Sequence, residues 1–342
     1  KVSNKHDPTV IPQSGDFTFF GGIYRDVTLI ACEKVHVDLL DYGSSGLYII
    51  PEKVTRELAY VTVCSTIHND SDIDKQIDIQ IKLKEPDAFT TNAYEDRYFS
   101  GLPLRFNKEH MGNGTVVIDD KVSVSIKAGE TYHYKKSFTV QRPHLWDGLN
   151  DPFRYETVLN LYEGNQKLDD VMQYVGFRYY TIDRHKGTFL NGHHYPLRGV
   201  ARHQDRQGMG NAVTINELTE DFSLIYELGA NSVRLSHYPH APYFYELCDK
   251  YGIVVYTEIP FVNGFGGGST YDEPSEVLTE FMRATRNQLT EMIKQHMNNT
   301  SVFFWGLHNE AQLADHRVMV PFIRELNQIV KNLDPTRLTV TA

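Results

Sequence analysis

Cysteine and tryptophan are scarce in this chain, whose 342 residues include only 3 Cys and 2 Trp. Cys32, Cys64 and Cys248 lie far apart and match no metal-binding or redox spacing. No apolar run approaches the roughly 18 residues of a membrane-spanning helix, so no such helix is predicted. The opening residues KVSNKHDPTV lack the hydrophobic segment of a signal peptide. The compartment therefore stays open, and a periplasmic or secreted location is compatible with these features.

Basic residues are also outnumbered, because 34 Lys and Arg stand against 44 Asp and Glu, a net charge of −10. A chain without a basic stripe releases few counterions, so neither nucleic acid nor an anionic membrane is expected as a partner. Aromatic residues are plentiful by contrast, with 21 Tyr and 18 Phe, as is typical of β-strands and carbohydrate-binding surfaces. The length predicts two or three domains.

Alternation of apolar and polar residues dominates the chain up to about residue 180. The stretch QIDIQIKL, residues 76–83, places its aliphatic side chains on one face and its polar side chains on the other. The stretch 121–140 repeats this pattern across a turn at Gly129, and similar short segments occur at 60–69, 154–164 and 171–180. The pattern predicts an antiparallel β-sandwich of immunoglobulin-like type, with a barrel of similar length as the alternative.

The segment FTFFGGIYRDVTLI, residues 17–30, predicts a strand, a Gly21-Gly22 turn and a second strand. Two strands alone cannot bury a hydrophobic face. We therefore expect them either to join the sandwich or to end a domain whose first strands precede Lys1.

Strands and helices alternate after residue 180. Thr214 and Glu217 form a capping-box pattern at the start of the first helix. Strands are expected within 195–206, 231–239, 253–260, 302–310 and 337–342, and helices within 214–230, 243–252, 275–297 and 320–333. This rhythm predicts parallel strands with right-handed crossovers, in a doubly wound sheet or a (β/α)8 barrel. The Gly-rich stretch 264–269 lacks the register of a phosphate-binding loop, so we expect a loop beside a site instead.

Titratable side chains occur where these predicted strands end. They are His203 with Asp205, His237, Glu258 and the run His308-Asn309-Glu310. In a (β/α)8 barrel the carboxyl ends of the strands converge on one cup that holds the catalytic groups. The pattern therefore favours a barrel over a doubly wound sheet.

Glu310 beside Asn309 fits a general acid/base next to an amide that holds a sugar hydroxyl. Apolar surroundings keep a carboxyl protonated until it must donate, and hydrogen bonds to a sugar 2-OH strengthen in the transition state. Arg234 could orient a second carboxylate in the same cup. Taken singly, each of these residues has an ordinary structural explanation, such as a solvated loop carboxylate. Their common position favours a site.

A metal is not predicted at these strand ends. His203, His237 and Glu258 could in principle serve as ligands, but no metal-binding spacing supports them.

Five segments of the chain resemble signature segments of glycoside hydrolase family 2, which includes β-galactosidases, β-glucuronidases and β-mannosidases. They are FFGGIYRDVTLI, LRGVARHQDR, GANSVRLSHYPH, LCDKYGIVVYTEIPF and VFFWGLHNE. The resemblance covers essentially the whole chain. It implies that residues 1–32 are the last strands of a jelly-roll sugar-binding domain and residues 33–180 an immunoglobulin-like β-sandwich. Residues 181–342 are then the N-terminal half of a catalytic (β/α)8 barrel.

The same resemblance implies roles for individual residues. Glu310 matches the general acid/base and Asn309 the residue that contacts the 2-OH. His203 and His237 match substrate-side histidines, Asp205 belongs to the same RHQDRQGMGNA segment, and Arg234 matches an arginine near the nucleophile. The nucleophilic Glu of this retaining family would follow residue 342, so we expect the chain by itself to be inactive.

The RHQDRQGMGNA segment is most similar to the β-galactosidase branch, which makes a retaining exo-β-galactosidase the leading hypothesis. A β-glucuronidase and a non-catalytic carbohydrate-binding protein are the alternatives. Family galactosidases bind magnesium through an acidic residue and a histidine where this chain has residues 261–265, FVNGF, so no cation or other cofactor is predicted. A carbohydrate is the expected partner, and a homo-oligomer is left open.

Overall fold

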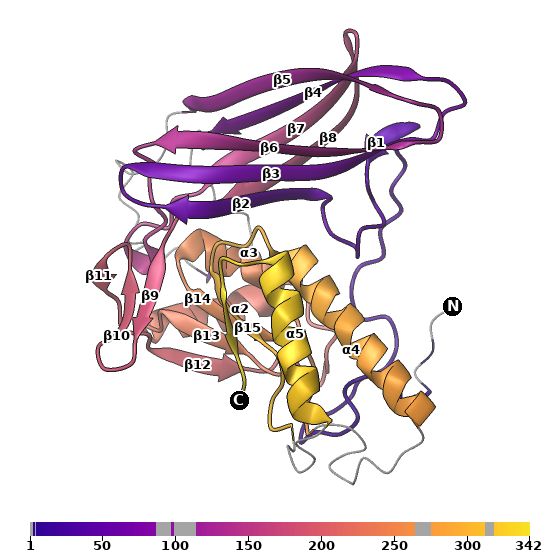
Figure 1. Cartoon of the computed structure of the whole chain (residues 1–342). Coiled ribbons are helices and arrows are strands. Elements are labelled where there is room, and N and C mark those ends of the chain that lie inside the picture. Colours follow the sequence, from indigo (N-terminus) through magenta and orange to yellow (C-terminus); the bar gives the residue numbers. More distant parts are fainter. Residues whose placement is uncertain (1–2, 4, 87–96, 99–113, 264–274, 312–317) are drawn as a thin grey trace.

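The computed structural model describes residues 3, 5–86, 97–98, 114–263, 275–311 and 318–342. Figure 1 shows a β-sandwich lying over one end of a curved parallel sheet with helices packed against it. The Gly-rich loop expected at 264–269 lies outside the described residues. No helix in the described part of the chain is long and apolar enough to cross a bilayer.

The sandwich consists of two four-stranded antiparallel sheets. One sheet contains β1 (Val35–Val37), β2 (Leu47–Val54), β3 (Leu58–Asn69) and β6 (Thr131–Gln141); the other has the order β5 (Val116–Ile126), β4 (Lys75–Lys84), β7 (Tyr155–Glu163) and β8 (Gln166–Val175). The alternation in β4 buries Ile77, Ile79, Ile81 and Leu83 almost completely between the sheets. This confirms the immunoglobulin-like sandwich.

Residues 17–30 do not form the predicted pair of strands. Their backbone joins no described sheet, and Ile23, Val27 and Leu29 are 66%, 80% and 97% exposed. A hairpin needs a sheet to cover its apolar face, and no described strand pairs with this segment. The segment instead runs along the half-barrel, where the Arg25 guanidinium donates to the Pro239 carbonyl at 3.0 Å. The assignment of residues 1–32 to a jelly-roll domain stays a prediction.

The second half of the chain forms five parallel strands in sequential order. They are β12 (Gly199–Arg202), β13 (Ser232–Leu235), β14 (Val254–Glu258), β15 (Val302–Gly306) and β16 (Leu338–Val340), with helices α2 (Ile215–Glu227), α3 (Pro242–Tyr251), α4 (Ser275–His296) and α5 (Met319–Leu333). A doubly wound sheet would reverse its strand order, whereas a barrel adds each strand beside the preceding one. The predicted partial barrel is therefore confirmed, and the capping box at Thr214 and Glu217 forms as expected.

The two faces of the parallel sheet differ. Helix residues such as Phe222 and Phe244 pack with Val233 and Val255 in the main apolar core. The opposite face lines a cleft of about 350 Å³, and Arg234 is one of the residues that line it. This inner face leads toward the carboxyl ends of the strands.

A small three-stranded sheet at the start of the barrel half is not anticipated by the sequence. It contains β9 (Tyr180–Asp183), β10 (Gly187–Leu190) and β11 (His193–His194). A 3₁₀ turn, η2 (Gly148–Asn150), lies earlier in the chain, between β6 and β7. Leu190 packs with Trp146, Val254 and Phe303 at the amino end of the parallel strands. Strands of two to four residues carry too short an alternation to be recognised by periodicity.

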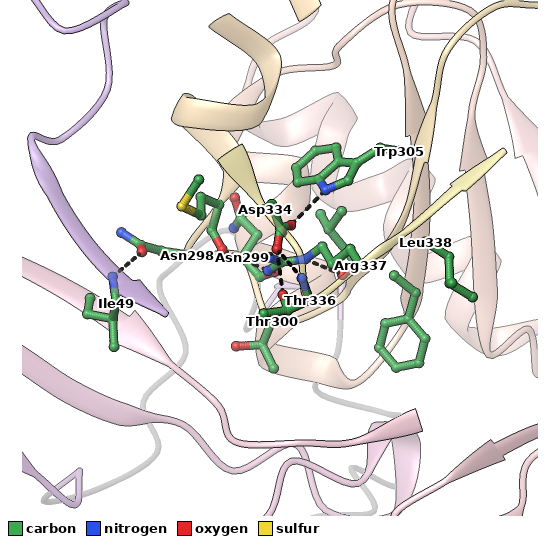
Figure 2. Close-up of polar contacts among 12 residues, drawn as sticks. Ile49, Asn298, Asn299, Thr300, Trp305, Asp334, Thr336, Arg337 and Leu338 are labelled. Carbon is green, nitrogen blue, oxygen red and sulfur yellow. Dashed lines mark hydrogen bonds and ion pairs between the residues drawn. The ribbon is translucent and has the colours of Figure 1, made fainter. Parts of the chain in front are cut away.

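The loop between α4 and β15 joins the barrel half to the sandwich (Figure 2). Asn298 Nδ2 donates to the Leu47 carbonyl at 2.7 Å, and the Ile49 backbone amide donates to Asn298 Oδ1 at 3.0 Å. The Thr300 hydroxyl accepts from the Gly176 amide at 2.7 Å. Strand β15 is thus anchored where it begins, at the end opposite to Asn309.

Candidate active site

The ends of β13, β14 and β15 bring four side chains into one hydrogen-bonded group. We call Arg234, His237, Glu258 and Asn309 the strand-end cluster. The fully buried Glu258 carboxylate accepts from Arg234 Nη2 at 3.0 and 3.1 Å and from Arg234 Nε at 3.3 Å. His237 Nδ1 lies 2.7 Å from Glu258 Oε1. A carboxylate without water is stable only with such partners, so the cluster depends on all of its members.

Asn309 is held by both its backbone and its side chain. Its amide donates to the Phe261 carbonyl at 2.9 Å, which continues the sheet past the end of β15. Its side-chain oxygen accepts from Arg234 Nη2 at 2.7 Å. Arginine has only donors, so the oxygen of the amide must face it and the Nδ2 hydrogens face elsewhere. Nδ2 has no hydrogen-bond partner within the described residues and is available to a ligand.

Gly306 explains how Glu258 fits at the end of β14. The two residues are register partners on adjacent strands. A Cβ at position 306 would lie 2.4 Å from the Glu258 Cβ and 2.6 Å from the Tyr256 ring. Both distances are far below van der Waals contact, so only glycine leaves room for the carboxylate.

Gly306→Ala is therefore expected to lower the free energy of unfolding by about 1–3 kcal/mol, because overpacking displaces the Glu258 backbone or the Tyr256 ring. Urea denaturation of the two proteins followed by circular dichroism measures the difference. An unchanged midpoint and slope would show that this end of the sheet adjusts freely.

His203 lies beside the strand-end cluster without a hydrogen bond to it. Its ring centroid is 5.1 Å from that of His237, and Phe17 lies 5.5 and 5.7 Å from the two imidazoles. Burial lowers the pKa of His203, and His237 lowers it further. His203 is therefore neutral at pH 7, and its buried Nδ1 has no described partner.

Asp205 does not join the strand-end cluster. Its side chain is exposed and forms no hydrogen bond with another described residue. It is near enough to His203 to act on the histidine electrostatically. Its neighbour Gln204 points the other way and accepts from the Ala241 amide at 2.6 Å. Among the described residues, Asp205 is a rim carboxylate.

The environment of Glu310 differs from the one that the sequence predicts. The sequence predicts apolar walls around this carboxyl, but the side chain is exposed in the described structure. Strand β15 ends at Gly306, and the backbone of Glu310 has a φ of 51°, in the left-handed region. This turn takes the Glu310 side chain out of the buried row that contains Asn309. In the described half of the barrel Glu310 is thus exposed, and the enclosed carboxylate at these strand ends is Glu258.

The described residues contain no group of three or more His, Cys, Asp or Glu side chains arranged to hold a metal ion. His237 Nδ1 and Glu258 are hydrogen-bonded to each other, which leaves that nitrogen unsuited as a ligand. The lack of a metal or cofactor stays a prediction.

Two parts of this site are missed by sequence reasoning. Glu258 is recognised there as a strand-end carboxylate but receives no role beyond that of an unsupported metal ligand. Phe17 comes from a segment nearly 190 residues before His203, and nothing in its FTFF context indicates contact with the histidines. The position of Glu258 at a strand end can be recognised from the sequence, whereas the contact of Phe17 with the histidines is seen only in the fold.

Comparison with known proteins agrees with the fold. Residues 45–178 match the family model "Glycosyl hydrolases family 2", and residues 183–341 match "Glycosyl hydrolases family 2, TIM barrel domain". The chain belongs to glycoside hydrolase family 2, as its signature segments indicate.

Several relatives are known by name. A β-glucuronidase of Bacteroides fragilis is 37% identical over the whole chain, which covers 45% of that protein. A β-galactosidase of Thermoanaerobacter pseudethanolicus is 29% identical over 96% of the chain and 38% of its own length. The crystal structure of a Bacteroides uniformis β-glucuronidase superposes with a TM-score of 0.85 at 31% identity, over 99% of this chain and 38% of that one. The chain thus spans less than half the length of these relatives.

Proposed function

We propose that the protein containing this chain is a retaining exo-β-glycosidase in which Glu310 is the general acid/base. The observation that supports this best is the strand-end cluster, in which buried Glu258 and Arg234 hold Asn309 directly before Glu310. A retaining enzyme needs an acid that protonates the leaving oxygen and then activates water. An exposed carboxyl beside a fixed amide donor at barrel strand ends suits both steps.

The other residues take supporting roles in this proposal. Asn309 donates its free Nδ2 hydrogens to the sugar 2-OH, where hydrogen bonds strengthen as positive charge develops on the ring. His203 and His237 face other hydroxyls, and Asp205 contributes at the rim. No cofactor, nucleic acid or membrane takes part. A homo-oligomer and an exported location stay predictions.

The nucleophile is a second carboxylate, about 5–5.5 Å from the acid/base in retaining enzymes. Glu258 does not suit this role, because its carboxylate is fully buried and bound by Arg234 and His237. We place the nucleophile outside residues 1–342, which is consistent with relatives more than twice as long. Residues 1–342 alone are then expected to be inactive.

The sugar is proposed to be β-D-glucuronic acid, with β-D-galactose second. The sequence favours the galactoside, but the similarity to a B. fragilis β-glucuronidase at 37% identity exceeds that to a T. pseudethanolicus β-galactosidase at 29%. The strand-end cluster by itself does not distinguish the two sugars.

A panel of 4-nitrophenyl β-glycosides tests this proposal. The glucuronide, galactoside, mannoside and glucoside are offered to the full-length gene product and, beside it, to residues 1–342. We expect glucuronide turnover by the full-length protein only. Preferred turnover of the galactoside would support the β-galactosidase hypothesis from the sequence. No turnover of any of the four glycosides would favour a carbohydrate-binding protein. Turnover by residues 1–342 would contradict the missing nucleophile.

A further inference from the structure

Glu258 is a buried carboxylate that the proposed reaction does not use. Its side chain is fully buried, whereas those of Arg234 and His237, to which it bonds, are 28% and 14% exposed. It therefore acts on the ligand side of the site through Arg234 and His237. We propose that Glu258 is a positioning residue that determines which atoms Asn309 and His237 present to the sugar, and so makes the site select for hydroxyl groups. This inference rests on the proposed function.

The first step runs through Arg234. Its guanidinium donates to both oxygens of Glu258, and its Nη2 also donates to Asn309 Oδ1. The aromatic face of Tyr256 lies beneath it, with 5.1 Å from the guanidinium carbon to the ring centroid. Arg234, held by Glu258 and Tyr256, keeps Asn309 Oδ1 facing its guanidinium. Asn309 can then offer only the N–H donors of Nδ2 to a ligand.

The second step runs through His237. A carboxylate accepts only, so the Nδ1 atom that lies 2.7 Å from Glu258 carries a hydrogen. A neutral imidazole with its hydrogen on Nδ1 has a lone pair on Nε2. The His237 side chain is 14% exposed, and its Nε2 forms no hydrogen bond with a described residue. In this neutral form, Glu258 makes His237 a hydrogen-bond acceptor.

Together the two steps define a donor at Asn309 and an acceptor at His237. Sugar hydroxyls can satisfy both atoms, because a hydroxyl donates one hydrogen bond and accepts others. A sugar that lacks a contacted hydroxyl leaves a polar atom of the site unpaired, and sites of this kind discriminate strongly against such analogues. The selectivity comes from the orientation of both groups, which one buried carboxylate sets.

A glutamine at position 258 separates this role from simple charge neutralisation. Its amide keeps the size of the side chain and one acceptor oxygen, but its nitrogen can only donate. With its oxygen in place of Oε1 it accepts from His237 Nδ1 and Arg234 Nη2, but its nitrogen then faces the Arg234 donors that Oε2 accepts from; with the amide turned over, the nitrogen faces His237 Nδ1. Either Arg234 loosens, or His237 must move its hydrogen to Nε2 and become a donor to the sugar.

The experiment compares kcat/KM for the preferred aryl β-glycoside and its monodeoxy analogues. It uses the full-length wild type, Glu258→Gln and a control, Glu325→Gln. Glu325 also accepts from the Nε and Nη2 atoms of an arginine, Arg286, at 2.6 and 2.9 Å, but on the outer helices. The electronic effect of removing a hydroxyl is the same for all three proteins and cancels in the comparison.

For the wild type and Glu325→Gln we expect at least one deoxy analogue to be slower by about 100-fold or more. Glu258→Gln is expected to lower kcat/KM on the parent sugar by about 100-fold, mostly in kcat, and to shrink that deoxy ratio to below about 10-fold. If Glu258→Gln does not fold, Glu258→Asp, which keeps the charge but withdraws the oxygens, is measured in its place.

An equal fall on the parent and on every deoxy analogue, with the ratio intact, would reduce Glu258 to a structural residue and overturn the inference. That result leaves the glycosidase itself intact. Absence of wild-type turnover on every aryl β-glycoside would instead contradict the proposed function, so the two failures can be told apart.

Discussion

Glu310→Gln is expected to lower kcat by about 10²–10⁴-fold on β-glycosides with poor leaving groups, the usual contribution of a general acid. The glutamine has the same shape but cannot protonate the departing oxygen. The 2,4-dinitrophenolate group leaves without protonation, so the first step of hydrolysis of a 2,4-dinitrophenyl glycoside should change little. Comparison of alkyl and dinitrophenyl glycosides with the full-length protein measures the difference.

Glu227→Gln is the matched control for this substitution. Glu227 is an exposed carboxylate at the end of α2 and takes no part in the strand-end cluster. Its variant should retain wild-type rates on both substrates. Equal losses of kcat/KM, which reports the first step, by Glu310→Gln on both kinds of leaving group would argue against acid catalysis by this residue.

Asp334→Ala is expected to lower the free energy of unfolding by about 3–5 kcal/mol, because it leaves a buried arginine unpaired. Asp334 Oδ2 lies 2.8 Å from Arg337 Nη1 and accepts from the Trp305 indole at 2.8 Å (Figure 2). The Arg337 guanidinium also donates to the Val302 carbonyl at 2.8 Å, at the start of β15. Urea denaturation of both proteins at pH 7 gives the difference.

The contribution of Asp334 should also depend on pH. Burial opposes its ionisation, but Arg337 and hydrogen bonds from Thr336 and Trp305 outweigh this and lower the pKa to about 2. A carboxyl whose pKa is depressed on folding stabilises the protein above its unfolded pKa of about 3.9 and loses that effect as pH falls toward the folded value.

The stability difference between wild type and Asp334→Ala should therefore be constant from pH 7 to about pH 5 and shrink between about pH 4 and pH 2. Asp72→Ala, at an exposed turn, should cost little at any pH. A wild-type advantage that persists unchanged to pH 2 would show that the ion pair is not its source.

Much of the fold can be predicted from sequence because burial differs between its two halves. Strand β4 is buried on one face and alternates, whereas β15 is packed on both faces and forms the apolar run VFFWG. The capping box at Thr214 and Glu217 is a local pattern and needs no tertiary information. The strand-end rule likewise brings Arg234, His237 and Asn309 to one place.

The remainder depends on tertiary contacts that no local pattern contains. Residues 17–30 have the alternation of strands but find no described sheet, and Phe17 contacts histidines that are distant in sequence. The left-handed φ of Glu310 after β15 likewise has no local sequence signal. The burial of Glu258 depends on Gly306 of the adjacent strand.

The most direct test of the central claim is azide rescue of a Glu310→Ala variant of the full-length protein, with a dinitrophenyl β-glycoside as substrate. Azide needs no base to attack a covalent glycosyl-enzyme, so it replaces water when the acid/base is absent. We expect faster turnover with azide and a β-glycosyl azide, identified by NMR, as the product. An α-glycosyl azide would identify Glu310 as the nucleophile, and an unchanged rate with no glycosyl azide would remove Glu310 from the chemistry.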